Sequence, residues 1–230
     1  MASASPRRLV PPVPPVRYLA AAVVTGSALM IGAMFDSEPP RPSAGQAFSA
    51  PPAGMPGRTA PATLLPVQPL PPAKPVRLRI PAIDVNAPMT KLGLDKAGAL
   101  KPPPAGNPNL VGWYGRGTAP GSTGTAVTAG HVDMRNGSPG VFYDLGALSK
   151  GDTIEISRAD RRTAVFTVDA VEIYEKRKFP SKKVYGSSGL PELRVITCGG
   201  YARRSGYQSN VVVYATLTAV KQPNGRFLAG

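Results

Sequence analysis

Proline is the residue that most constrains this chain, because its distribution separates a part that can fold from a part that cannot. Residues 37–76 contain twelve prolines in forty positions and show no hydrophobic period that would bury a face. Proline lacks a backbone donor and favours extended geometry, so we expect a semi-stiff linker over residues 36–75. The roughly 155 residues that follow, 76–230, suffice for one compact domain.

A membrane anchor is predicted before the linker. Residues 1–17 carry three arginines and no acidic residue, and the stretch Tyr18–Phe35 carries no charge. In a helix this stretch spans about 27 Å, close to the thickness of a bilayer core. It is longer than the apolar run of a signal peptide, so an uncleaved transmembrane anchor is favoured over a cleaved signal. The arginines place residues 1–17 in the cytoplasm and the domain outside, at the plasma membrane.

The composition excludes several classes of site. The formal net charge is +14, which suits nucleic acid, an anionic membrane surface or an anionic wall polymer. The outward topology and the lack of a nucleic-acid motif argue against the first of these. One cysteine and one histidine rule out an intramolecular disulfide and a His/Cys zinc cluster. No acidic cluster suggests calcium, so no metal or cofactor is expected.

The domain is predicted to be mainly β. After Val76 the sequence shows short runs, several of them alternating apolar with polar residues, separated by Gly, Pro and Asn. Short strands at this spacing predict a barrel or a sandwich. A helical turn is expected only at Val141–Leu148. The predicted strands are Arg77–Ile80, Leu110–Tyr114, Thr125–His131, Thr153–Ser157, Thr163–Tyr174, Leu193–Cys198 and Asn210–Val220.

The single histidine and the single cysteine both stand at the ends of predicted strands. They close the motifs Thr-Ala-Gly-His131 and Val-Ile-Thr-Cys198, and each has a glycine neighbour. A thiolate attacks carbonyls, and a nearby imidazole stabilises it and protonates a departing amine. Alternatively, Cys198 is a small buried hydrophobe and His131 a satisfied surface residue. Position alone leaves both interpretations open.

Several short motifs surround these two residues in a fixed order. They are Leu78-Arg79-Ile80-Pro81-Ala82-Ile83-Asp84-Val85, Gly112-Trp113-Tyr114, Pro120-Gly121, Thr128-Ala129-Gly130-His131-Val132-Asp133, Thr197-Cys198-Gly199-Gly200 and Asn210-Val211-Val212-Val213-Tyr214-Ala215. With these motifs behind an N-terminal anchor, the chain from about Val76 to Val220 resembles the sortases, membrane-anchored cysteine transpeptidases of Gram-positive cell surfaces. The last two motifs are most similar to the actinobacterial class F.

The resemblance implies an eight-stranded sortase-type β-barrel with short helices and no cofactor. Cys198 would attack the Thr-Gly bond of an LPXTG-like sorting signal in a surface protein, forming a thioester. His131 would protonate the leaving amine and then deprotonate the incoming amine, from a peptidoglycan precursor or another protein. Ala129, Thr197 and Asn210 are the expected substrate-binding residues.

The resemblance also implies an arginine at the start of the last strand, whose charge would stabilise the oxyanion. In many sortases it directly precedes the apolar run of that strand, and here Asn210 occupies the place. The nearest candidates are Arg203 and Arg204, in the Gly-rich loop after Cys198. One of them is expected to reach the groove; the alternative is that both are solvated loop residues.

Two rival functions stay open on the sequence alone. A sortase-like hydrolase or an impaired transpeptidase is favoured if no arginine reaches the groove. A non-catalytic, membrane-tethered barrel that binds anionic wall polymer would explain the charge without chemistry. The basic cluster Lys176-Arg177-Lys178 with Lys182-Lys183 is either a solvated loop or the loop that shapes sorting-signal specificity.

Overall fold

The computed structural model of the chain describes residues 38–48, 67–198, 209–223 and 227–229. By its contacts the chain divides into units 1–38 and 39–230, and all the elements below belong to the second. The predicted cytoplasmic tail and anchor, residues 1–17 and 18–35, lie outside the described residues, as do Arg203 and Arg204. Within the described ranges, no helix combines the length and apolarity needed to cross a bilayer.

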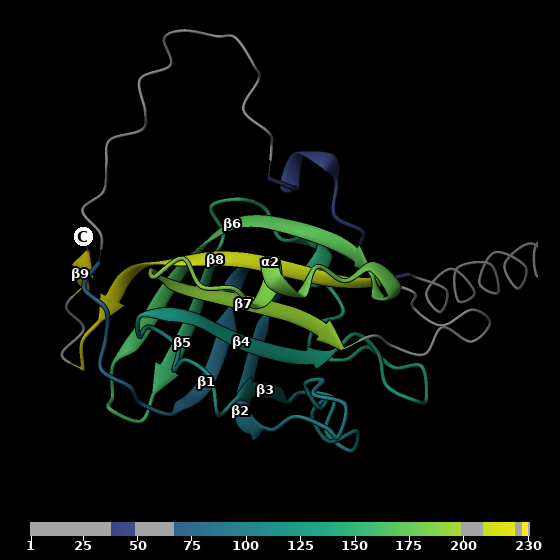
Figure 1. Cartoon of the computed structure of the whole chain (residues 1–230), viewed down its shortest axis with the longest axis horizontal. Coiled ribbons are helices and arrows are strands. Elements are labelled where there is room, and N and C mark those ends of the chain that lie inside the picture. The colour runs from purple at the N-terminus through teal and green to yellow at the C-terminus, as the bar shows by residue number, and fades with distance from the viewer. Residues whose placement is uncertain (1–37, 49–66, 199–208, 224–226, 230) are drawn as a thin grey trace, which may run out of the picture. The chain divides into compact units, whose positions relative to one another are not determined.

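Eight strands close into a barrel, as predicted (Figure 1). Their order is β6-β5-β1-β2-β3-β4-β7-β8, and β6 also pairs with β8, which closes the ring. The pairs β2–β3 and β4–β7 are parallel and the other pairs are antiparallel. A short ninth strand, β9 (Phe227–Ala229), pairs with the C-terminal end of β8. The barrel strands are β1 (Pro75–Ile80), β2 (Val85–Leu92), β3 (Val111–Tyr114), β4 (Gly124–His131), β5 (Thr153–Arg158), β6 (Thr163–Glu175), β7 (Pro191–Cys198) and β8 (Ser209–Lys221).

The described helices are short. They are the 3₁₀ turns η1 (Ala44–Gln46), η2 (Pro81–Ile83), η3 (Leu145–Ala147) and η4 (Lys176–Lys178), and the α-helix α2 (Ser181–Tyr185). The helical turn predicted at Val141–Leu148 is present as η3. The structure adds α2, which the sequence did not predict. Val184 of α2 packs against Val212 and Tyr214 of β8, so this helix covers part of the barrel's outer face.

Two apolar clusters lie on opposite faces of β4, β7 and β8. Neighbouring residues of a strand point to opposite faces, so Leu193 and Val195 fill the barrel interior while Ile196 belongs to an outer cluster. Because both faces are covered, β4 is buried along nearly its whole length. The outer cluster consists of Val127, Ala170, Val184, Ile196, Val212 and Tyr214.

Two parts of the predicted linker contact the barrel. Leu70 is buried and its N–H donates to the carbonyl of Gly121, while Val67 packs against the interior cluster. Earlier in the chain, the Gln46 side-chain amide donates to the carbonyls of Gly146 and Leu148. Among the described residues, Val67 and Leu70 therefore contact the core several residues before the predicted boundary at 75.

Candidate active site

The two residues singled out by the sequence are neighbours in the sheet. Strands β4 and β7 pair in parallel with one unbroken register, from Gly124 opposite Pro191 to His131 opposite Cys198. Adjacent strands lie about 4.8 Å apart, so the backbone brings the chain's one imidazole and one thiol to the same end of the same strand pair. The register thus places the two residues on directly opposite positions of neighbouring strands.

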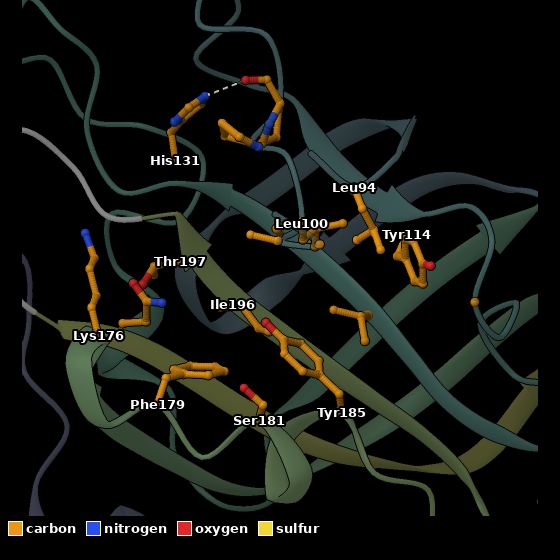
Figure 2. A pocket seen from close by; sticks show the side chains of 18 of the residues that line it. Leu94, Leu100, Tyr114, His131, Lys176, Phe179, Ser181, Tyr185, Ile196 and Thr197 are labelled. Atoms are coloured by element: carbon orange, nitrogen blue, oxygen red, sulfur yellow. Dashed lines mark hydrogen bonds between the residues drawn. The ribbon is translucent and has the colours of Figure 1, made fainter. Parts of the chain in front are cut away.

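A cavity of about 1120 Å³ opens on the outer face beside this strand pair. Figure 2 shows His131 at one end of it, with Thr197 and Ile196 along the neighbouring strand. Ala129, Thr197 and Asn210, the residues expected to bind substrate, all line the same cavity. The cavity is large enough for several residues of an extended peptide. The substrate-binding roles of these three residues stay predictions.

The floor of the cavity is apolar. Val127 and Ile196 of the outer cluster line it, and Leu100 and Tyr114 pack against that cluster and line the cavity too. Tyr114 and its neighbour Trp113 have different roles, because they point to opposite faces of β3. Trp113 is buried, and its indole N–H donates to the carbonyl of Thr118 at 3.0 Å. Such a floor suits apolar side chains of a bound peptide.

One wall of the cavity is held by a polar network behind it. Phe179 and Tyr185 line this wall, and the Phe179 ring lies 5.9 Å from that of Tyr174. The Tyr174 hydroxyl donates to Glu172, which also accepts from Lys183 of α2 at 3.1 Å. Burial, and then the hydrogen bond to Glu172, raise the pKa of Tyr174 to about 12. Its hydroxyl therefore stays protonated and remains a donor throughout the physiological pH range.

His131 is fixed at both its backbone and its ring. Its carbonyl accepts the Phe142 N–H at 2.9 Å, which anchors the last residue of β4. Its ring nitrogen Nε2 lies 2.8 Å from the carbonyl oxygen of Pro103, as the dashed line in Figure 2 marks. Pro103 has no signature in the sequence, because no motif marks a backbone carbonyl that contacts a residue far along the chain.

Thr197 has a clear structural contact as well as its place in the cavity. It is 2% exposed, and its hydroxyl oxygen accepts the N–H of Val211 at 2.9 Å. This bond joins the ends of β7 and β8 immediately beside Cys198. Thr197 therefore helps to hold the end of β7 in place, whatever contact it makes with substrate.

Two cations among the described residues line the cavity, Arg135 and Lys176. Lys176 directly follows Glu175, and Glu175 lies opposite Ser209 in the β6–β8 pair. Lys176 is therefore close to Asn210, the residue after Ser209. Arg135 was not singled out from the sequence, because it belongs to an unremarkable loop after His131. In the part of the chain that the structure describes, no three His, Cys, Asp or Glu side chains gather as metal ligands would.

Comparison with known proteins identifies the family of the chain. The model of the sortase domain matches residues 78–218, which is more than half of the chain. None of the curated proteins matches this chain. Among solved structures, the chain is similar to sortase A of Listeria monocytogenes, at 17% identity and a TM-score of 0.48, over 64% of this chain and 88% of that one.

Two further sortases show similar values. Sortase A of Corynebacterium diphtheriae is 22% identical, with a TM-score of 0.46, over 64% of this chain and 61% of that one. Sortase C-1 of Actinomyces oris is 20% identical, with a TM-score of 0.46, over 62% and 72% of the two chains. The domain match carries the assignment, and it includes both His131 and Cys198. The chain belongs to the sortase family of cysteine transpeptidases.

Proposed function

We propose that this sortase cleaves an LPXTG-like sorting signal between Thr and Gly and transfers the new acyl group to a cell-surface amine. The observation that carries the proposal is the register of β4 and β7, which pairs His131 with Cys198 beside the cavity. Sortases act on sorting-signal proteins and an amine acceptor, and the apolar floor of this cavity suits the Leu and Pro of such a signal. The two short motifs around Cys198 and Asn210 support an assignment to class F.

The proposed reaction has two halves. The Cys198 thiolate attacks the Thr carbonyl, and the imidazolium of His131 gives its proton to the departing Gly amine as the C–N bond breaks. This leaves a thioester on Cys198 and a neutral imidazole. The acceptor amine then attacks the thioester, His131 takes its proton, and the thiolate leaves as a new amide forms. Proton and nucleophile return to their starting state.

The proposed location rests on the three arginines of residues 1–17, a segment without acidic residues, and on the uncharged stretch Tyr18–Phe35. We propose that this stretch anchors the protein in the plasma membrane, with the barrel outside. The basic barrel would then face the anionic polymers of a cell wall, where sorting-signal proteins and acceptor amines meet.

The proposal is tested by incubating the full-length protein in detergent with an LPXTG-type peptide and a Gly-based amine, and following the products by mass spectrometry. We expect an acyl-enzyme whose mass increase equals the peptide up to Thr, followed by the amide product. Free acid as the main product in the presence of amine would indicate a hydrolase. Binding of wall polymer without any peptide cleavage would support the non-catalytic barrel.

The oxyanion role is predicted for Arg203 or Arg204. A preorganised cation at the developing oxyanion is worth about 2.7–4 kcal/mol, so losing it should slow acylation 10²–10³-fold. Arg203→Ala and Arg204→Ala should be measured separately for acylation, with Lys replacements as controls, because Lys keeps the charge and loses the planar fork. If neither Ala variant slows acylation by about tenfold, neither residue has the role, and Arg135 and Lys176, which line the cavity, become the candidates.

A further inference from the structure

The ring of His131 is bound to the main chain of a distant loop. Its Nε2 lies 2.8 Å from the carbonyl oxygen of Pro103, in the connection between β2 and β3. A carbonyl oxygen has no hydrogen to give, so the hydrogen in this bond belongs to Nε2. The opposite tautomer, with the hydrogen on Nδ1, would turn the Nε2 lone pair toward the oxygen lone pairs.

The loop that supplies this carbonyl is held in place by its own sequence. Pro103 is buried, between the exposed Pro102 and Pro104, and the three rings restrict φ at three successive residues. Upstream, the Asp95 side chain accepts the N–H groups of Ala97 and Ala99, and Lys101 N–H donates to Gly93. Leu100 packs against the outer cluster. These restraints keep the Pro103 carbonyl at a fixed position relative to the barrel.

We propose that the Pro103 carbonyl is a positioning group that keeps the proton on Nε2 of His131 throughout the reaction. This rests on the proposed function, in which His131 shuttles a proton for Cys198. With Nε2 committed to Pro103, Nδ1 is the nitrogen that gives a proton to the departing amine and takes one from the incoming amine. Pro103 never touches the substrate's reacting atoms in this role.

The bond also matters for the charged state of the site. An imidazolium has two N–H donors, and in a partly buried site the one that faces away from the thiolate needs an acceptor. A hydrogen bond from a charged donor is roughly twice as strong as one between neutral groups. The Pro103 carbonyl supplies that acceptor in the proposed acylation step, and it holds the ring at a fixed angle.

The test uses the fact that the chain has one histidine. Two-bond ¹H–¹⁵N correlation spectra of the ¹⁵N-labelled full-length protein report directly which ring nitrogen carries hydrogen in the neutral imidazole. We expect one tautomer, with hydrogen on Nε2, and this measurement needs no substrate. A spectrum of the Nδ1–H tautomer, or of a mixture, would overturn the proposal even if the enzyme is fully active.

A pair of variants tests the effect on catalysis. In Pro102→Gly/Pro104→Gly the exposed rings are removed, so the loop loses its rigidity while the buried Pro103 stays. We expect a mixture of tautomers and acylation slower by on the order of 10- to 100-fold, since misplacing a catalytic group costs such factors. Pro108 is an exposed proline in the same connection, so Pro108→Gly is the matched control. It should change neither the tautomer of His131 nor the rate of acylation.

The outcomes separate this proposal from the proposed function. Slower acylation with an unchanged tautomer would mean that the loop acts through substrate binding, which contradicts a positioning role. A shift of tautomer together with slower acylation supports it. If no sorting peptide acylates Cys198 at all, the proposed function fails, while the tautomer of the unmodified protein still decides whether Pro103 holds the ring.

Discussion

The Cys198→Ala variant is expected to form no acyl-enzyme and to transfer no acyl group to an amine. Cys198 is the one thiol in the chain, and the β4–β7 register places it opposite His131. Removing a covalent nucleophile eliminates the thioester pathway, and in comparable enzymes the loss exceeds about 10³-fold. Mass spectrometry of the protein after mixing with an LPXTG-type peptide measures the acyl-enzyme directly.

The same variant should keep its fold, because a small side chain replaces another small one. Its melting temperature is therefore expected to stay close to that of the wild type. Ser122→Ala is a matched control, since it makes a similar small change at a buried hydroxyl that does not line the cavity. Acyl transfer by Cys198→Ala near the rate of wild type would disprove the nucleophile assignment.

The largest expected effect on stability comes from Arg158, whose side chain is fully buried at the end of β5. Its guanidinium donates to the carbonyls of Pro120 and Pro71 and forms an ion pair with Asp160 at 3.0 Å. Arg158→Met leaves the buried carbonyl of Pro120 and the partly buried carbonyl of Pro71 without this donor, and an unpaired buried polar group costs about 1–3 kcal/mol. We expect the free energy of unfolding to fall by about 3 kcal/mol, measured by urea denaturation.

Arg162→Met is the control for this prediction. Arg162 also pairs with Asp160, at 2.8 Å, but 27% of its side chain is exposed. An exposed ion pair contributes about 0–1 kcal/mol, so the control should cost far less than Arg158→Met. Equal losses in the two variants would show that the Asp160 pair, and not the two carbonyls, accounts for the effect.

The Asp160 carboxyl predicts how part of the stability depends on pH. Burial by itself would raise its pKa, but hydrogen bonds from Arg158 and the Arg162 N–H, with both guanidinium charges, hold the pKa below its usual value of 3.8. A carboxyl whose pKa is lower in the folded state stabilises the fold above that usual value and loses this contribution as the pH falls further. The difference in the free energy of unfolding between wild type and Arg158→Met should therefore become smaller in strong acid.

Much of the barrel could be predicted because its strands alternate clearly. Thr153–Ser157 and Thr163–Tyr174 match β5 and β6 closely, since apolar residues alternate into the interior along β5 and along the first half of β6. Strand β2 was missed because Pro88 lies in its middle, and proline is a poor residue for a strand. Its pairing with both β1 and β3 outweighs that local preference.

That His131 and Cys198 would lie together could be predicted for a different reason. A single cysteine and a single histidine, each at a strand end beside glycine, leave few other partners for this chemistry. The rest of the site depends on contacts between segments far apart in the chain. The carbonyl of Pro103, the wall of Phe179 and Tyr185, and the loop cation Arg135 have no local signature, because only the closed barrel brings them to the cavity.

The parallel pairing of β4 with β7 has a consequence for how activity arises during folding. Parallel neighbours cannot be joined by a hairpin, and here the whole of β5 and β6 intervenes between the two strands. Contacts across such long stretches of chain form late, after the entropy of closing the loop has been overcome. An incompletely folded chain thus carries a thiol without its imidazole, and an isolated thiol is mainly protonated at neutral pH. Under the proposed mechanism, reactivity toward peptides is therefore acquired only once β4 and β7 are paired, so an incompletely folded chain should not yet form an acyl-enzyme.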